Sequence, residues 1–259
     1  MSVDLDRGYW VCFKCGEKGN LTNLAARMGS SIDPGVIAKV KAESVNDLYE
    51  EAPDFSVKAG ALHRNALKVR PMAIVRYILD RGLTKGILNQ FNIGWDGERI
   101  SMPYAVDERV VGIKYRYPDG HKTNEPGTQR YLYNVNEARN QRTVIICEGE
   151  SDTQAVWSYI DRLGMLGRGV GVTGVPGVGK GLPGRKTWEL WSLEMLWSEA
   201  IYIAFDNDEA GDWGAEIPLS IFGDRAHRVV PTKGKDMAEH LLKGGTLREC
   251  GMDEAHLFV

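Results

Sequence analysis

The chain has 259 residues, 43% of them hydrophobic and 26% charged, and its formal net charge is −3. This length is enough for one large domain or two small ones, and the composition favours a packed, soluble core over a disordered chain. No apolar run approaches the roughly 20 residues that span a bilayer, and the first residues lack the basic and apolar regions of a signal peptide. Four cysteines at irregular spacing do not form a disulfide framework, so we expect a reducing, cytoplasmic compartment.

The charge is unevenly distributed along the chain. Residues 1–55 carry a net charge of −3, residues 56–130 a net charge of +6, and residues 131–259 a net charge of −6. A basic middle segment beside an acidic one can hold a polyanion against a metal site, although ordinary fluctuation of composition also produces such blocks.

The first segment is short and contains a cysteine pair. Residues 9–16 are typical of a strand followed by a tight knuckle, and Asn20 is a suitable cap for a helix that ends at Gly29. A second helix is predicted to begin at Asp33, before Pro34. Residues 43–62 have weak periodicity and are predicted to form a linker. Cys12 and Cys15 have the spacing of a zinc knuckle, but zinc needs four ligands.

The middle segment, from about residue 63 to residue 140, is predicted to be mixed α/β. Pro71 opens a helix that Gly82 ends, and Thr84 caps a shorter one. Strands are predicted over 92–95, 100–106, 110–117 and 130–133. In the third of these strands Lys114 and Arg116 share one face, and the apolar side chains share the other.

The third segment, residues 141–246, alternates between strands and helices. Strands are predicted over 143–147, 169–173, 200–205 and 228–230, and helices over 151–163, 185–196, 211–222 and 236–242. This alternation with short connections predicts a parallel sheet covered by helices on both faces.

Carboxylates follow the strands of this segment at the points where the strands end. The sequence Glu-Gly-Glu-Ser-Asp follows residue 147, and Asp-Asn-Asp-Glu-Ala-Gly follows residue 205. The carboxyl ends of parallel strands meet at one edge, where α/β proteins bind ligands. Crowded carboxylates favour a hard divalent cation, so we predict a site for Mg²⁺ or Mn²⁺, with room for two ions. The residues expected to bind the metal are Glu148, Asp152, Asp206, Asp208 and Asp236.

These motifs resemble the Toprim domain, which is shared by bacterial-type primases, type IA and type II topoisomerases and some nucleases. The resemblance rests on Glu-Gly-Glu-x-Asp at 148–152, Asp-x-Asp-x-x-Gly at 206–211 and Lys-Asp at 235–236. Residues 77–84, 91–95, 99–103, 111–117 and 130–134 are similar to the amino-terminal half of a bacterial or phage primase core. The resemblance covers about residues 70–245. It departs from the family pattern at Ala238, where many such primases carry another acid.

The resemblance implies a DNA primase, a DNA-directed RNA polymerase that makes short RNA primers on single-stranded DNA by two-metal nucleotidyl transfer. It implies that Glu148 is the catalytic carboxylate and that Asp206 and Asp208 hold Mg²⁺, assisted by Asp152 and Asp236. The partners would be single-stranded DNA, ribonucleoside triphosphates and a replicative helicase, in a bacterial or phage-infected cell. Cys12 and Cys15 resemble the second half of a primase zinc ribbon whose first half is absent, which leaves the zinc site incomplete.

Basic side chains near these motifs are candidates for contacts with DNA or nucleotides. A solvated strand face is the alternative for Lys114 and Arg116. The glycine-rich loop at 174–181 nearly fits a phosphate-binding Walker A loop, but Gly181 stands where Ser or Thr is required, so we interpret it as a flexible basic loop. The DNA- or nucleotide-binding candidates are Lys114, Arg116, Lys122, Arg130, Lys180 and Lys235.

The sequence therefore predicts an α/β protein in which a small basic α/β lobe precedes a Toprim domain. Its expected divisions are a partial zinc ribbon (1–30), a linker with a short helix (31–62), the basic lobe (63–140), the Toprim domain (141–246) and a tail (247–259). Two alternatives stay open: a Toprim nuclease, and a catalytically silent module that binds single-stranded DNA for a helicase.

Overall fold

The computed structural model describes residues 2–4, 9–11, 18–20, 52–176 and 183–253. Three short strands near the amino terminus pair in antiparallel fashion: β1 (Ser2–Asp4), β2 (Tyr9–Val11) and β3 (Lys18–Asn20). The strand predicted to begin at residue 9 is present. The cysteine knuckle and the helices expected after Asn20 and Asp33 lie outside the described residues.

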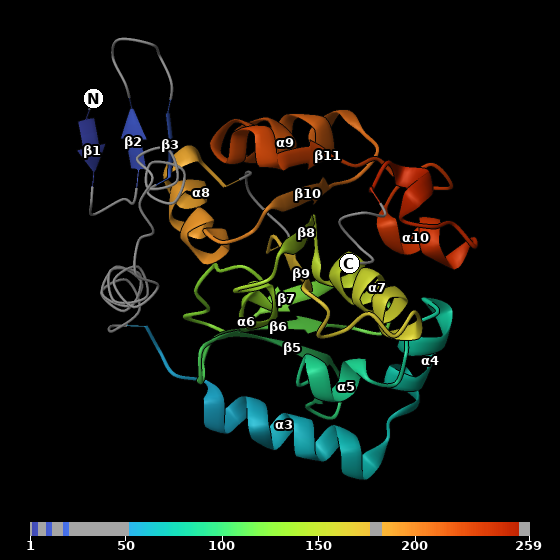
Figure 1. Ribbon diagram of the computed structural model, residues 1–259. Helices are drawn as coiled ribbons and strands as arrows, with labels where there is room; N and C mark the ends of the chain where they lie inside the picture. Colours follow the sequence, from blue (N-terminus) through green and yellow to red (C-terminus); the bar gives the residue numbers. More distant parts are fainter. Residues whose placement is uncertain (1, 5–8, 12–17, 21–51, 177–182, 254–259) are drawn as a thin grey trace.

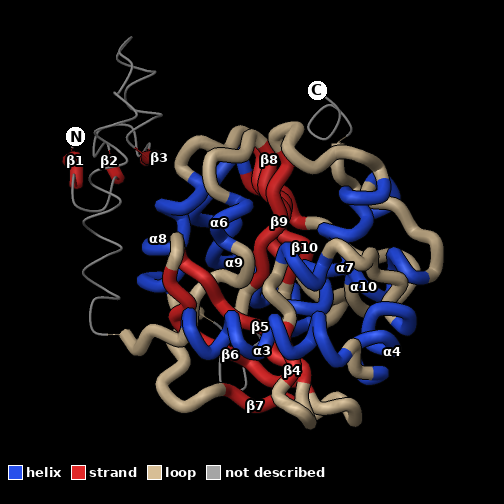
Figure 2. The backbone as a smooth tube through the Cα atoms, turned by 90° about the horizontal axis from the view of Figure 1, so that it is seen from below, coloured by secondary structure: helices blue, strands red, loops and turns tan. Residues whose placement is uncertain are grey.

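A first lobe, which we call the basic lobe, is an antiparallel sheet covered by helices. Its sheet has the order β4-β5-β6-β7, and α3 runs beneath it (Figures 1 and 2). Its elements are α3 (Ser56–Val69), α4 (Met72–Asp80), α5 (Ile87–Gln90), β4 (Gly94–Trp95), β5 (Ile100–Val106), β6 (Arg109–Arg116) and β7 (Lys122–Asn124).

Two predictions for this lobe were wrong. The linker expected up to residue 62 is helical from Ser56, because α3 packs Ala59 and Ala66 against the sheet. The strand expected over 130–133 is reduced to one bridge between Tyr133 and Gly174 of the neighbouring lobe. The fourth strand is β7 instead, which pairs with the end of β6.

The two faces of β6 alternate as predicted, but neither faces solvent. Ile113 and Tyr115 pack toward Ala59 of α3 in a small apolar cluster. Lys114 lies on the other face and is only 7% exposed, because that face lies against the second lobe. The solvated-face alternative for Lys114 is therefore excluded.

The second lobe, which we call the acidic lobe, contains a four-stranded parallel sheet with the order β11-β10-β8-β9. In Figure 1, α7 and α10 cover one face of the sheet, and α8 and α9 cover the other. The elements are α6 (Val135–Ala138), β8 (Thr143–Cys147), α7 (Glu150–Arg162), β9 (Val170–Gly174), α8 (Arg185–Ser192), η1 (Leu193–Met195), β10 (Ala200–Ala204), α9 (Glu209–Phe222), η2 (Gly223–Arg225), β11 (Ala226–Arg228), α10 (Met237–Leu242) and η3 (Arg248–Cys250).

The predicted parallel sheet with helices on both faces is confirmed. The strand predicted over 228–230 lies two residues earlier, and the helix predicted over 185–196 ends at Ser192 and continues as a 3₁₀ turn. The predicted tail is partly packed, since Leu247, Cys250 and Met252 are buried. His240 of α10 holds this segment by a contact of 2.9 Å between its Nε2 and the carbonyl oxygen of Thr246.

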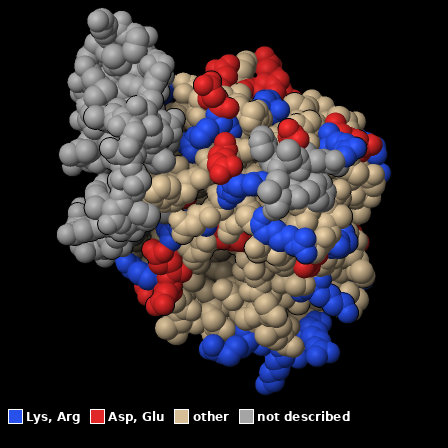
Figure 3. All heavy atoms as spheres, in the orientation of Figure 1, with Lys and Arg blue, Asp and Glu red and all other residues tan. Residues whose placement is uncertain are grey.

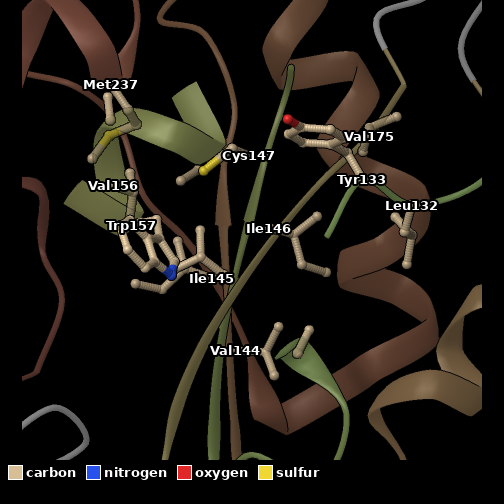
Figure 4. Packing of buried hydrophobic residues seen from close by; sticks show 14 of the residues in the cluster. Leu132, Tyr133, Val144, Ile145, Ile146, Cys147, Val156, Trp157, Val175 and Met237 are labelled. Atoms are coloured by element: carbon tan, nitrogen blue, oxygen red, sulfur yellow. The ribbon is translucent and has the colours of Figure 1, made fainter. Parts of the chain in front are cut away.

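The core of the acidic lobe is continuous with that of the basic lobe. All five residues of β8 are buried, as expected for a central strand with both faces covered. Ile145 points toward Trp157 of α7, whereas Ile146 points to the other side of the sheet (Figure 4). Tyr133 extends this core into the basic lobe, where its ring stacks on Phe91 at a centroid distance of 5.2 Å. No helix within the described residues is long and apolar enough to cross a membrane.

Candidate functional site

The loops after β8 and β10 bring two of the predicted acidic motifs into contact. Glu148 follows β8, and its Oε2 accepts a hydrogen bond of 2.9 Å from the backbone N–H of Asp206, which follows β10. These loops are neighbours because β8 and β10 pair in parallel, with Cys147 opposite Ala204. The expected meeting of the two motifs at the carboxyl edge of the sheet is therefore present.

The loop after β10 is shaped by contacts with its own neighbours. Asp208 caps α9 by accepting a hydrogen bond of 2.9 Å from the N–H of Gly211. A side chain at Gly211 would collide with the carbonyl oxygen of Asp206, so this close turn requires glycine. Arg228 of β11 supports the same loop. It donates a hydrogen bond of 2.8 Å to the carbonyl oxygen of Asp206 and forms an ion pair with Asp212 at 2.9 Å.

Lys235 lies across this pair of aspartates. Its ammonium is 3.2 Å from Asp206 Oδ2 and 3.1 Å from Asp208 Oδ2. The hydrogen bonds to Asp208 and Asp206 raise the pKa of Lys235 to about 12. Lys235 was predicted to contact DNA or nucleotide; in this structure it is the counter-ion of the acidic pair.

The acidic groups also act on one another. Burial raises the pKa of Glu148, and the charges of Asp206 and Asp208 add to the increase. Burial likewise raises the pKa of Asp206, with further repulsion from Asp236 and Asp208, although Lys235 opposes it. The pKa of Asp208 is lowered by its hydrogen bonds from Gly211 and Lys235.

Asp152 and Asp236 complete the acidic set on the side of α10. Asp236 caps α10 by accepting a hydrogen bond of 2.7 Å from the N–H of Glu239. Asp152 accepts a hydrogen bond of 3.0 Å from the N–H of Ala238. Burial, followed by repulsion from Asp236, raises the pKa of Asp152 to about 7. At Ala238, where the family pattern has an acid, the backbone N–H binds a carboxylate.

This donor set fits a hard divalent cation, although three ligands are not gathered around one point. Among the described residues, no group of three or more His, Cys, Asp or Glu side chains has the arrangement of a metal site. The chemistry nevertheless fits, because the oxygens are of the kind that Mg²⁺ prefers and the ammonium of Lys235 lies where a cation bridges Asp206 and Asp208. Asp206 and Asp208, with Glu148 beside them, are the residues that could hold the ion.

The basic lobe faces this edge with several cations. Lys114 of β6 pairs with Oε1 of Glu150 at 2.5 Å, and Lys122 of β7 lies 3.5 Å from Oε2 of the same carboxylate. Tyr104 of β5 also donates a hydrogen bond to Glu150. Burial would raise the pKa of Glu150, but the charges of Lys114 and Lys122 outweigh it and lower the pKa to about 2.

Two arginines flank one tyrosine ring next to this cluster. The guanidinium carbon of Arg81 lies 4.5 Å from the ring centroid of Tyr77, and that of Arg116 lies 5.8 Å from it. Burial lowers the pKa of Arg116, and the like charge of Arg81 lowers it further. Neither arginine forms an ion pair within the described part of the chain, so both can bind an anion.

The other predicted residues are placed as follows. Arg130 is exposed, and its charge acts on Lys114. Lys180 and the cysteines Cys12 and Cys15 lie outside the described residues. The other two cysteines, Cys147 and Cys250, are buried and unpaired.

Sequence reasoning missed three residues of this site: Arg81, Tyr104 and Glu150. Arg81 lies within the segment 77–84 that carried the primase resemblance, and the net charge of the middle segment also pointed to this lobe. Glu150 was visible in the acidic motif, but nothing in the sequence shows which carboxylate faces the basic lobe.

Comparisons with known proteins support this architecture. The primase fragment of the bacteriophage T7 primase-helicase protein superposes with a TM-score of 0.54 and 18% identity over 67% of this chain and 73% of that chain. The fold is that of a Toprim-type primase catalytic core.

Two further primase structures show the same likeness. The DnaG catalytic domain bound to single-stranded DNA gives a TM-score of 0.56 and 17% identity over 77% of each chain. The Escherichia coli primase catalytic core gives a TM-score of 0.57 and 16% identity over 78% of each chain. No family of known proteins matches the sequence. No curated protein matches it either.

Proposed function

We propose that this chain is a DNA primase core that joins ribonucleotides on a single-stranded DNA template. The observation that carries the proposal is the arrangement around the start of α7. Carboxylates that repel one another follow β8 and β10, and Glu150 at the start of α7 is paired with Lys122 and lies within reach of the charge of Arg116, which shares the Tyr77 ring with Arg81. A site that brings phosphates to a divalent metal needs both, because cations hold the polyanion and carboxylates hold the metal.

The roles of the acidic residues follow from their contacts. Glu148 has one oxygen held by the N–H of Asp206, and its raised pKa suits a group that accepts a proton or binds a cation. Asp206 and Asp208 present oxygens to one point, which Lys235 occupies. A bound Mg²⁺ would neutralise phosphate charge and favour attack by a 3′-hydroxyl.

The roles proposed for the basic residues follow from guanidinium groups that have no ion-pair partner within the described residues. Arg81 and Arg116 offer planar donors suited to phosphate oxygens, while the Tyr77 ring fixes their position. Arg130 is exposed, its charge acts on Lys114, and it would add a contact to the template backbone. These cations are proposed to hold the template and the incoming triphosphates.

A primer-synthesis assay tests the proposal. The full chain would be incubated with random-sequence single-stranded DNA, Mg²⁺ and the four ribonucleoside triphosphates, one of them radiolabelled. We expect short labelled oligoribonucleotides from the unaltered chain and none from Glu148→Gln or Asp206→Asn. Glu199→Gln is the matched control, because this carboxylate lies at the amino end of β10, opposite the site, and its side chain is 70% exposed.

Two results would contradict the proposal. Cleavage of the template in place of copying would identify a nuclease. Binding of DNA without any product, equal with and without Mg²⁺, would identify a silent binding module. The structural neighbours support a role in copying: one primase catalytic domain is bound to single-stranded DNA, and the primase domains of another interact with a lagging-strand DNA polymerase in a complex that contains an RNA/DNA hybrid and dTTP.

A further inference from the structure

Glu150 is a buried carboxylate that the proposed chemistry does not use. Its side chain is 0% exposed, and it lies in the first turn of α7, two residues after Glu148. All of its described partners come from the basic lobe. Tyr104 and Lys114 contact Oε1, and Lys122 contacts Oε2, so each oxygen faces a cation. The charge of this carboxylate is therefore compensated by groups of the basic lobe.

The two lysines held by Glu150 differ in their access to solvent. The side chain of Lys114 is 8% exposed, whereas that of Lys122 is 37% exposed. A buried ammonium only compensates the carboxylate, but a partly exposed one keeps donors for a further ligand, since lysine has three. Lys122 is thus the member of the cluster that can contact a bound molecule.

Lys122 also lies close to the acidic site. Its charge acts on Asp152, which is itself coupled to Asp206. The ammonium of Lys122 lies 3.5 Å from Glu150, which stands in the first turn of α7, two residues after Glu148 and two before Asp152.

Glu150 is the anchor that fixes this ammonium. Lys122 belongs to β7, a three-residue edge strand, and its only ion-pair partner in the described part of the chain is Glu150. A lysine side chain without a partner samples many rotamers, and ordering it on binding costs free energy. A partner on a rigid helix removes much of that cost before the ligand arrives.

We propose that Glu150 is a positioning residue, which holds the Lys122 ammonium beside the acidic site so that it contacts a phosphate of a bound nucleoside triphosphate. This inference rests on the proposed function, since it assigns a substrate group to the same site. It adds a role that the acidic motif does not indicate: the middle carboxylate acts through a lysine of the other lobe.

A double-mutant cycle on ATP binding tests the inference. The dissociation constant of ATP with Mg²⁺ would be measured by titration calorimetry for the full chain and for Glu150→Gln, Lys122→Gln and the double variant. We expect each single change to weaken binding about ten-fold, and the double change to weaken it no further, because both remove one contact. The inference would be overturned if the double variant weakened ATP binding by the product of the single effects, near a hundred-fold. It would also be overturned if Glu150→Gln left the ATP dissociation constant unchanged.

A second buried carboxylate provides the matched control. Glu194 is also 0% exposed and accepts hydrogen bonds from a tyrosine, Tyr131, and a cation, Arg139. Glu194→Gln should lower thermal stability as Glu150→Gln does, but leave the ATP dissociation constant unchanged. An equal loss of ATP affinity in both variants would mean that Glu150 acts only through stability, and would overturn the inference.

Folding and the proposed function are separated from the inference by two further measurements. If Glu150→Gln does not fold, the cycle uses Lys114→Met/Glu150→Gln in its place, since replacing both partners of a buried pair avoids an unpaired buried charge.

If the unaltered chain makes primers and Glu150→Gln has an unchanged ATP dissociation constant, the inference alone is refuted. If the unaltered chain makes no primers, the proposed function is refuted. The ATP dissociation constants of the cycle still test whether Glu150 positions Lys122. Failure of the unaltered chain to bind ATP overturns the inference.

Discussion

At the scale of single residues, the acidic site carries its own cation. Lys235 contacts both Asp206 and Asp208, and its side chain is 62% exposed. An exposed ion pair of this kind contributes little to stability, because solvent screens it. Its larger effect would be on ligands, since a divalent ion bound at the proposed site would have to compete with the ammonium for the same two carboxylates.

Lys235→Met should therefore tighten metal binding. We expect the dissociation constant for Mn²⁺ to fall about five-fold, the equivalent of about 1 kcal/mol for a lost exposed ion pair. Electron paramagnetic resonance of free Mn²⁺ would measure the change. Lys233→Met is the control, because Lys233 pairs with Glu249 and does not touch the aspartates. Unchanged or weaker Mn²⁺ binding in Lys235→Met would contradict the competition.

Asp152 is predicted to make stability depend on pH. Its pKa is raised by burial from 3.8 to about 7, so between these values the folded chain holds a proton that the unfolded chain has released. Stability therefore falls as pH rises from about 4 to about 7 and is constant above that range. Asp152→Asn removes this loss.

Urea unfolding in EDTA, with the metal removed, would measure this effect. We expect Asp152→Asn to exceed the unaltered chain in stability by about 2–4 kcal/mol at pH 8 and by little at pH 4. Asp80→Asn, an exposed change, should follow the unaltered chain at both values. A constant difference between Asp152→Asn and the unaltered chain across this pH range would refute the assignment.

The sequence predicted which carboxylates meet, but not what each one contacts. Glu148, Asp206 and Asp208 follow apolar strand runs, and the pairing of parallel strands places their loops together. Glu150 and Lys114 were beyond such reasoning, because the two residues are 36 positions apart in the chain and their contact joins two different lobes. Local sequence patterns do not show how the two lobes pack against each other.

At the scale of secondary-structure elements, the start of α9 controls the geometry of the site. Gly211 lies in the first turn of α9 and packs directly on the backbone of Asp206. The same residue donates the hydrogen bond that caps the helix at Asp208. The helix and the loop after β10 are therefore positioned by one close approach of two backbone segments.

Gly211→Ala should disturb the loop more than the helix. The added methyl group meets the backbone of Asp206, so the loop must shift, and we expect a loss of about 1–3 kcal/mol in stability together with weaker Mn²⁺ binding. Gly184→Ala is the control, since a methyl group at that exposed helix start meets no other atom. Unfolding and Mn²⁺ titration measure both effects; a stabilised Gly211→Ala would contradict the packing.

The elements that sequence analysis missed have weak patterns for identifiable reasons. Helix α3 buries only two alanines, Ala59 and Ala66, so its apolar stripe is faint. Strand β7 consists of Lys, Thr and Asn and forms because the end of β6 offers an unpaired edge. The strands of the parallel sheet were predictable, because β8 and β10 are continuous apolar runs buried on both faces.

At the scale of the whole molecule, two lobes of opposite charge share one core. Figure 3 shows acidic side chains at the upper edge of the molecule and a group of Lys and Arg side chains at its lower end, with both kinds present between them. Tyr133 joins the lobes: its backbone forms a β-bridge with Gly174, and its hydroxyl accepts a hydrogen bond of 2.8 Å from the side chain of Gln154. The charge blocks in the sequence indicated this contrast, but the shared core was not visible there.

A shared core predicts a single cooperative unfolding transition for residues 52–253. Tyr133→Ala should cost about 3–5 kcal/mol and accelerate amide exchange in both β5 and β8, because it empties a site where the lobes meet. Tyr133→Phe, which keeps the ring, should cost about 1 kcal/mol. Exchange that accelerates in one lobe only would show that the lobes open independently.

The buried pair of Lys114 and Glu150 has a consequence for how such a chain can vary over time. Loss of either residue alone removes the closest charge partner of the other in the interior, and breaking such a buried pair costs about 3–5 kcal/mol, which rivals much of a domain's stability. Descendants of this chain should therefore keep both residues or lose both. Diversification at these two positions should proceed by paired replacement, and libraries that randomise them jointly should recover more folded members than libraries that randomise either one.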